Sequence, residues 1–175
     1  GAKWPDELAG ETPPAPPDPK AARMMELLRA GDRRAFQEML SEDPRVARLK
    51  GPGGSTPLMY AVLYGDADDV RLLLDNGADP NARNEAGARP LMWAVDDLEK
   101  TRLLLGRGAD VNARSEDGRT ALAVAASRFG SLDVVRLLLD SGANPSVKSP
   151  SYKGTSPPLA EAANAEPGFP LRMNT

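Results

Sequence analysis

The chain of 175 residues contains neither cysteine nor histidine. Without cysteine it can form no disulfide, no thiolate nucleophile and no zinc site that uses cysteine. Without histidine it lacks the most common general base and the most common metal ligand, so Ser-His-Asp, Cys-His and His-Glu-x-x-His arrangements are excluded. We therefore expect no enzyme activity, no cofactor and no bound metal.

Long apolar runs and a strong charge of one sign are also missing. No stretch approaches the roughly 18 uncharged apolar residues of a membrane span. The first residues include Lys3, Asp6 and Glu7 but no apolar segment, so no signal peptide is visible, although a piece of an exported protein would look the same. Residues 20–153 carry 20 basic and 19 acidic side chains. This near-neutral composition predicts no nucleic-acid partner and no membrane insertion.

What the chain does contain is copies of one unit. Residues 77–94 return with changes as residues 108–125, and leucine-rich runs at 70–74, 101–105 and 134–139 flank these copies at matching distances. A period near 33 residues is typical of a solenoid, in which each unit buries its apolar face against its neighbours. The leucine runs are therefore expected in the core.

The first unit is predicted to be a pair of short antiparallel helices. Apolar periodicity indicates one helix at residues 21–30, which Gly31 ends, and a second at residues 33–41. The sequence Asp43-Pro44 ends the second helix, because the residue before a proline is disfavoured in the helical region.

The next unit carries clearer helix signals. Thr56 is placed to cap a helix whose first residue is Pro57 and which ends near Gly65. Its partner helix is predicted at residues 67–75. Residues 78–88 are polar and contain glycine, which favours an extended hairpin loop that projects from the helices.

These units resemble ankyrin repeats, whose pattern is a Thr-Pro-Leu-His-x-Ala opening, two helices and a Gly-Ala-Asp-x-Asn-Ala ending. The resemblance covers roughly residues 21–163, and it implies an all-α ankyrin-repeat solenoid of helix-turn-helix units with projecting β-hairpin loops. It places about four repeats and a partial fifth at 20–165, between a proline-rich linker at 1–19 and an irregular tail at 166–175. The matching segments are Thr56-Pro57-Leu58 with residues 77–82, residues 89–94 with residues 108–113, and Thr120-Ala121-Leu122 with residues 142–146.

Several positions depart from the family pattern. The repeat spacing is 33, then 31, then 37 residues, with a deletion at Asp96-Asp97 and insertions near Phe129 and in residues 149–156. Met59, Met92 and Ala123 replace the family's histidine, so we expect its hydrogen bonds to be lost at a modest cost in local stability. Residues 157–163 begin a further helix without a partner, which favours a truncated solenoid over a divergent last repeat.

The first five residues, Gly-Ala-Lys-Trp-Pro, resemble the end of a planctomycete-type cytochrome c domain. This second resemblance implies an alternative function, that of a structural or interaction appendage of a larger exported cytochrome c-type redox protein. The compartment would then be periplasmic, and otherwise cytoplasmic. The chain itself contains no Cys-x-x-Cys-His haem-attachment motif.

The ankyrin resemblance implies a non-catalytic protein-protein interaction module, which we expect to be monomeric, with a protein partner of unknown identity. Its concave groove would present equivalent positions of successive first helices. Trp and Tyr often carry binding energy at interfaces, which makes the groove a candidate interface. The alternative is that Tyr60 and Trp93 only pack between adjacent helices. The candidate groove residues are Tyr60, Tyr64, Trp93, Val124 and Phe129.

The tips of the projecting loops are a second candidate surface, for which the alternative is simple solvation. Three carboxylate pairs, Asp68-Asp69, Asp96-Asp97 and Glu116-Asp117, are interpreted as solvated turns or helix faces, because no second group converges on them. The candidate tip residues are Arg83, Asn84, Glu85 and Ala88, then Arg114, Ser115, Glu116 and Arg119, then Lys148, Tyr152 and Lys153.

Overall fold

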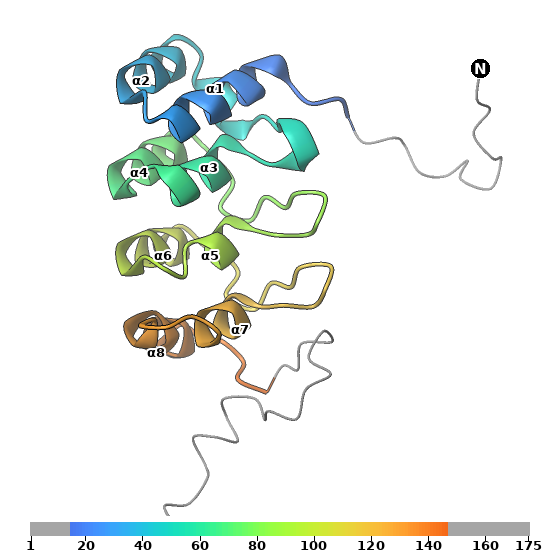
Figure 1. Ribbon diagram of the computed structural model, residues 1–175, viewed down its shortest axis with the longest axis vertical. Coiled ribbons are helices and arrows are strands. Elements are labelled where there is room, and N and C mark those ends of the chain that lie inside the picture. The colour runs from blue at the N-terminus through green and yellow to red at the C-terminus, as the bar shows by residue number, and fades with distance from the viewer. Residues whose placement is uncertain (1–14, 147–175) are drawn as a thin grey trace, which may run out of the picture.

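The computed structural model describes residues 15–146, which form a stack of four helix pairs (Figure 1). Within these residues the regular elements are helices, with no β-strand, so the predicted all-α solenoid is confirmed. We number the pairs unit one to unit four. They are α1 (Pro19–Ala30) with α2 (Arg33–Glu42), α3 (Pro57–Tyr64) with α4 (Ala67–Asp75), α5 (Pro90–Trp93) with α6 (Leu98–Gly106), and α7 (Ala121–Ala126) with α8 (Leu132–Asp140).

The helices stand in two columns (Figure 1). The first-helix column is α1, α3, α5 and α7, each in contact with the next, and the second-helix column includes the contacts of α4 with α6 and of α6 with α8. Two short 3-10 helices, η2 (Pro44–Arg48) and η3 (Pro52–Gly54), join unit one to unit two. The loops between units project to one side of the stack.

Capping side chains set the helix ends. Thr56 Oγ1 accepts a hydrogen bond from the Met59 amide at 3.4 Å, and Pro57 is the first residue of α3, as predicted. The helix α1 begins at Pro19, earlier than the apolar pattern suggested, because Asp18 accepts from the Lys20 amide at 2.8 Å. A helix start can therefore precede the first apolar residue when a capping residue and a proline lie before it.

Unit three is the short one. Its first helix, α5, has four residues and no side-chain cap, because Arg89 stands where unit two has Thr56. Asp97 then starts α6 by accepting from the amides of Glu99 and Lys100 at 3.0 and 3.1 Å. The two-residue deletion thus shortens the first helix, while the second helix keeps the nine residues of α4.

The projecting loops are hairpin-shaped and contact one another. In residues 78–88 the Asn84 amide donates to the Ala88 carbonyl at 3.1 Å across a turn that contains Gly87 at φ +69°. The Glu116 amide of the next loop donates to the Ala86 carbonyl at 3.1 Å. A Cβ atom at Gly87 would lie 2.7 Å from the Glu116 amide nitrogen, so this glycine allows both the turn and the close approach.

Two asparagines join consecutive units through backbone atoms. Asn81 Nδ2 donates to the Gly108 carbonyl at 2.9 Å, and Asn81 Oδ1 accepts from the Asp110 amide at 2.7 Å. Asn112 repeats this arrangement with the Gly142 carbonyl at 3.0 Å and the Asn144 amide at 2.8 Å. The exposed loops of consecutive units are therefore joined by hydrogen bonds.

The core runs between the two columns. Leu73, Leu104 and Leu138, the middle leucines of the three runs, are fully buried, as predicted. The last leucines differ: Leu74 is 6% exposed and Leu139 is 41% exposed.

Apolar side chains occupy the histidine position of the family pattern. Met59 is completely buried and Met92 is 5% exposed, within the packed interior. Burial of each of these side chains contributes roughly 1.5–3 kcal/mol, which offsets the hydrogen bonds that a histidine would make.

Several sequence-based predictions fall outside the described residues. They are residues 1–14 of the linker predicted at 1–19, with the cytochrome-like start, the loop insertion at 149–156, the partial fifth repeat at 157–163 and the tail at 166–175. The last residue of the predicted linker, Pro19, is instead the first residue of α1. Among residues 15–146, no helix combines the length and hydrophobicity needed to cross a membrane.

Candidate interaction surface

The first-helix column carries an exposed aromatic side chain at the end of α3. Tyr64 on α3 is 53% exposed, and its ring centroid lies 5.7 Å from that of Tyr60 at an interplanar angle of 46°. This separation and tilt are typical of favourable aromatic pairs. Leu63, next to Tyr64, is 48% exposed. The end of α3 therefore exposes two large apolar side chains.

Three other predicted groove residues are only partly exposed. Tyr60, Trp93 and Val124 occupy equivalent positions in α3, α5 and α7, and each packs against the core cluster. This is the packing that the alternative interpretation predicted, yet each side chain keeps some exposed surface. Together with Tyr64, these residues form what we call the aromatic face.

Phe129 lies apart from the first helices. It is fully exposed in the turn between α7 and α8, directly before Gly130, whose φ is +79°. The inserted residue of the long repeat lies in this turn, between α7, which has six residues, and α8, which keeps nine.

The loop-tip residues are linked to one another. Arg83 lies 3.5 Å from Glu116 of the next loop, and its carbonyl accepts from Lys50 Nζ at 3.1 Å. Asn84 turns its side chain inward, where Oδ1 accepts from the amides of Ala86 and Ala88. Asn84 thus shapes the loop, while Glu85 is exposed.

The second loop tip has its own small network. Ser115 Oγ donates a hydrogen bond to Asp117, and Arg119 lies 2.8 Å from the same carboxylate. These contacts, the Ser115 bond first, lower the pKa of Asp117 below its usual range. Arg114 is exposed on this loop. The tip residues Lys148, Tyr152 and Lys153 lie outside the described residues.

The interpretation of Asp68-Asp69 as a solvated pair is wrong for Asp69. Its side chain is buried because it closes a capping box, in which Oδ2 accepts from the Asp66 amide at 3.1 Å. Arg33 Nε lies 3.3 Å from Oδ1. Burial raises the pKa of Asp69, whereas the amide bond from Asp69 lowers the pKa of Asp66.

Lys100 is the residue that sequence reasoning missed. It is buried, and its Nζ donates to the carbonyls of Val62 at 3.0 Å and of Gly65 at 2.7 Å. These carbonyls lie at the end of α3, where helix carbonyls lack intrahelical partners. A lysine on a leucine-rich helix gave no local signal of this role, because its acceptors belong to the preceding unit.

Ion pairs between units were also not predicted. They join side chains about one repeat apart in sequence, so the pairing follows from the stacking of the units. The pairs are Arg33 with Asp66, Arg107 with Asp75, and Arg128 with Asp96.

Within residues 15–146, no cluster of three or more acidic side chains is placed to hold a metal ion. The described part of the chain is a helical repeat stack with open surfaces on its first helices, its loops and its second helices. Such architectures offer extended surfaces to partners.

Comparison with known proteins identifies the repeats. A family model described as ankyrin repeats (3 copies) matches residues 24–115 and 58–149, which together are most of the chain. The chain therefore belongs to the ankyrin repeat family, as the resemblance implied. Ankyrin repeats are generally protein-protein interaction modules and are typically non-catalytic.

Similar curated proteins match the chain over about two repeats. A transient receptor potential cation channel subfamily A member 1 homolog from Caenorhabditis elegans is 41% identical over 63 residues, 36% of this chain and 5% of that protein. The probable E3 ubiquitin-protein ligase XBOS32 from Oryza sativa subsp. japonica is 38% identical over 73 residues, 41% of this chain and 15% of that protein. The human ankyrin repeat domain-containing protein 63 is 36% identical over 63 residues, 36% of this chain and 17% of that protein. The chain thus matches only a small part of each relative.

Proposed function

We propose that this chain binds a protein partner through the aromatic face and the loop tips, without catalysis. The observation that carries the proposal is the exposed apolar surface at the end of α3, where Tyr64 and Leu63 are about half exposed. Large exposed aromatic and apolar side chains that lie together mark interaction sites.

The loop tips add polar contacts beside this apolar surface. Glu85, Arg114 and Arg119 are exposed, and the hydrogen bonds within and between the loops hold their backbone in place. A surface that is already ordered loses less conformational entropy on binding than a mobile one. The loops therefore suit the polar rim of an interface whose centre is the aromatic face.

The test is partner capture by variants of the exposed aromatic residue. The chain is used to co-purify proteins from cells that express it, and captured proteins are quantified by mass spectrometry. We expect Tyr64→Ala to reduce capture of the specific partner by about tenfold or more, as for other interface aromatics. Tyr64 is half exposed, so its removal leaves the core intact, and circular dichroism checks the fold.

A matched control removes an exposed apolar side chain elsewhere. Leu139→Ala alters the second-helix column, at a residue that is 41% exposed, and should leave capture unchanged. The proposal fails if folded Tyr64→Ala and a folded Tyr64→Ala, Trp93→Ala double variant both retain every partner at the level of the unmodified chain.

A further inference from the structure

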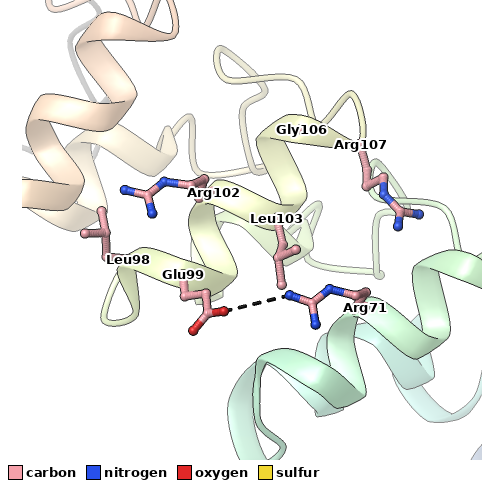
Figure 2. A pocket seen from close by; sticks show the side chains of 7 residues that line it. All are labelled: Arg71, Leu98, Glu99, Arg102, Leu103, Gly106 and Arg107. Carbon is pink, nitrogen blue, oxygen red and sulfur yellow. Dashed lines mark ion pairs between the residues drawn. The ribbon is translucent and has the colours of Figure 1, made fainter.

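A hollow lies on the second-helix column between α4 and α6 (Figure 2). Its volume is about 450 Å³. Arg71 contributes from α4, and the other lining residues belong to α6 and to Arg107, which caps that helix. It is thus separate from the aromatic face on the first helices.

The hollow arises where unit three departs from the other units. At the end of its second helix, unit three has Gly106-Arg107, where unit two has Asp75-Asn76 and unit four has Asp140-Ser141. A Cβ atom at Gly106 would meet no heavy atom within 4 Å, so the missing side chain leaves open space. The same exchange removes a carboxylate and adds a guanidinium.

The arginines around the hollow are unpaired or hold carboxylates that another carboxylate could replace. Arg102 is exposed and makes no ion pair with any residue in the range 15–146. Arg71 is shared between Asp68 at 2.7 Å and Glu99 at 3.8 Å, and Arg107 pairs with Asp75. Such exposed ion pairs contribute little to stability, so incoming carboxylates can replace them.

Two leucines contribute apolar surface to the hollow, and Glu99 adds one carboxylate to its lining. Leu98 and Leu103 line it and are partly buried against the core. Figure 2 shows Arg71 beside Leu103 and Glu99, Arg102 near Leu98 on the other side of α6, and Arg107 at the far end of α6. A ligand that fits must therefore combine negative groups at the rim with an apolar group between them.

We infer that this hollow is a docking site for an acidic segment of a partner protein, in which carboxylates flank an apolar side chain. The carboxylates pair with Arg71, Arg102 and Arg107, since guanidinium groups bind carboxylates in bidentate geometry. The apolar side chain covers Leu98 and Leu103. A nucleic acid is disfavoured because the repeats are nearly neutral overall, with 20 basic and 19 acidic residues in 20–153.

The test uses a synthetic peptide, acetyl-Glu-Asp-Leu-Asp-Glu-amide, and its basic counterpart with lysine at the four acidic positions. Each is titrated into the 15N-labelled chain at low salt and followed by NMR. We expect saturable shifts of amides in α6 and at Arg71 with the acidic peptide only. Arg102→Glu should weaken the affinity at least about fivefold, because it places like charges together. Gly106→Asp, which introduces the aspartate that units two and four have at this position, should also weaken the affinity at least about fivefold.

The matched control is Arg136→Glu, which reverses an arginine at the equivalent position of α8, outside the lining of the hollow. We expect less than about a twofold effect, since Arg136 does not line the hollow. The inference is overturned if the acidic peptide produces no saturable shifts, if Arg136→Glu weakens binding as much as Arg102→Glu, or if Gly106→Asp leaves the affinity unchanged. Tyr64→Ala should not affect binding of the acidic peptide. The proposal for the hollow and the proposal for the aromatic face are therefore tested independently.

Discussion

Unit two and unit three have closely related sequences but different means of holding their helices. Unit two has a capped first helix of eight residues and a capping box at the start of its second helix. Unit three has an uncapped first helix of four residues, yet its second helix is as long as that of unit two. Unit three lacks the helix cap and the capping box of unit two, and it instead makes contacts with its neighbouring units.

The position of Asp69 shows the difference most clearly. In unit two this aspartate folds back onto its own helix start. The equivalent residue in unit three is Lys100, which reaches into unit two and donates to two carbonyls at the end of α3. At this position of the repeat, Asp69 stabilises its own unit, whereas Lys100 stabilises the unit that precedes its own.

The largest expected effect breaks this contact between units. Lys100→Met keeps the apolar stem but leaves the carbonyls of Val62 and Gly65 without their donor. We expect the free energy of unfolding to fall by about 1–3 kcal/mol, measured by urea denaturation. The matched control is Lys50→Met, because Lys50 is exposed and makes one bond to the Arg83 carbonyl. Equal losses in the two variants would show that burial of Lys100 adds nothing.

A smaller effect should follow from giving unit three the cap of unit two. Arg89→Thr places a hydroxyl where Thr56 and Thr120 accept from their helix amides. It also removes Arg89 Nε, which is buried without a hydrogen-bond partner. We expect a gain of about 1 kcal/mol in unfolding free energy. Thr120→Ala is the reverse control and should lose a similar amount. A loss in both variants would show that the Arg89 bond to the Asn81 carbonyl matters more.

The smallest effect concerns the charge on Asp69 and depends on pH. Burial raises the pKa of this carboxyl in the folded chain, so its ionised form costs stability above the usual aspartate range. Asp69→Asn keeps an acceptor for the Asp66 amide but never ionises. We therefore expect the stability of the variant relative to the unmodified chain to rise between pH 3 and pH 7.

The control for this pH dependence is Asp68→Asn, at the exposed neighbour that pairs with Arg71 at 2.7 Å. Unfolding midpoints at both pH values provide the measurement. If Asp69→Asn instead loses stability at pH 7, the attraction between Asp69 and Arg33 outweighs the cost of burial.

The sequence predicted the features that a single unit determines. Thr56 and Pro57 identified the start of α3, and Asp96-Asp97 located the break before α6, because caps and breaks act within a few residues. The burial of Lys100 could not be predicted, since its acceptors belong to the preceding unit. The burial of Asp69 was missed although its capping partner, Asp66, lies only three residues earlier. The exposure of Leu63 was also missed, because it lies beside Tyr64 at a helix end, where apolar periodicity does not separate the core side from the open side.

The asparagine bonds and the ion pairs between units differ in what they recognise. Asn81 and Asn112 contact only a carbonyl and an amide of the following unit, atoms that nearly every residue supplies. Arg107 and Asp75 must instead match each other as side chains. The asparagine hydrogen bonds can therefore form with any neighbouring unit, whereas the ion pairs can form only with a unit that carries the matching side chain. A unit moved to another place in the stack would keep its asparagine hydrogen bonds to the backbone but lose its ion pairs. The ion pairs therefore favour one order of the repeats over others.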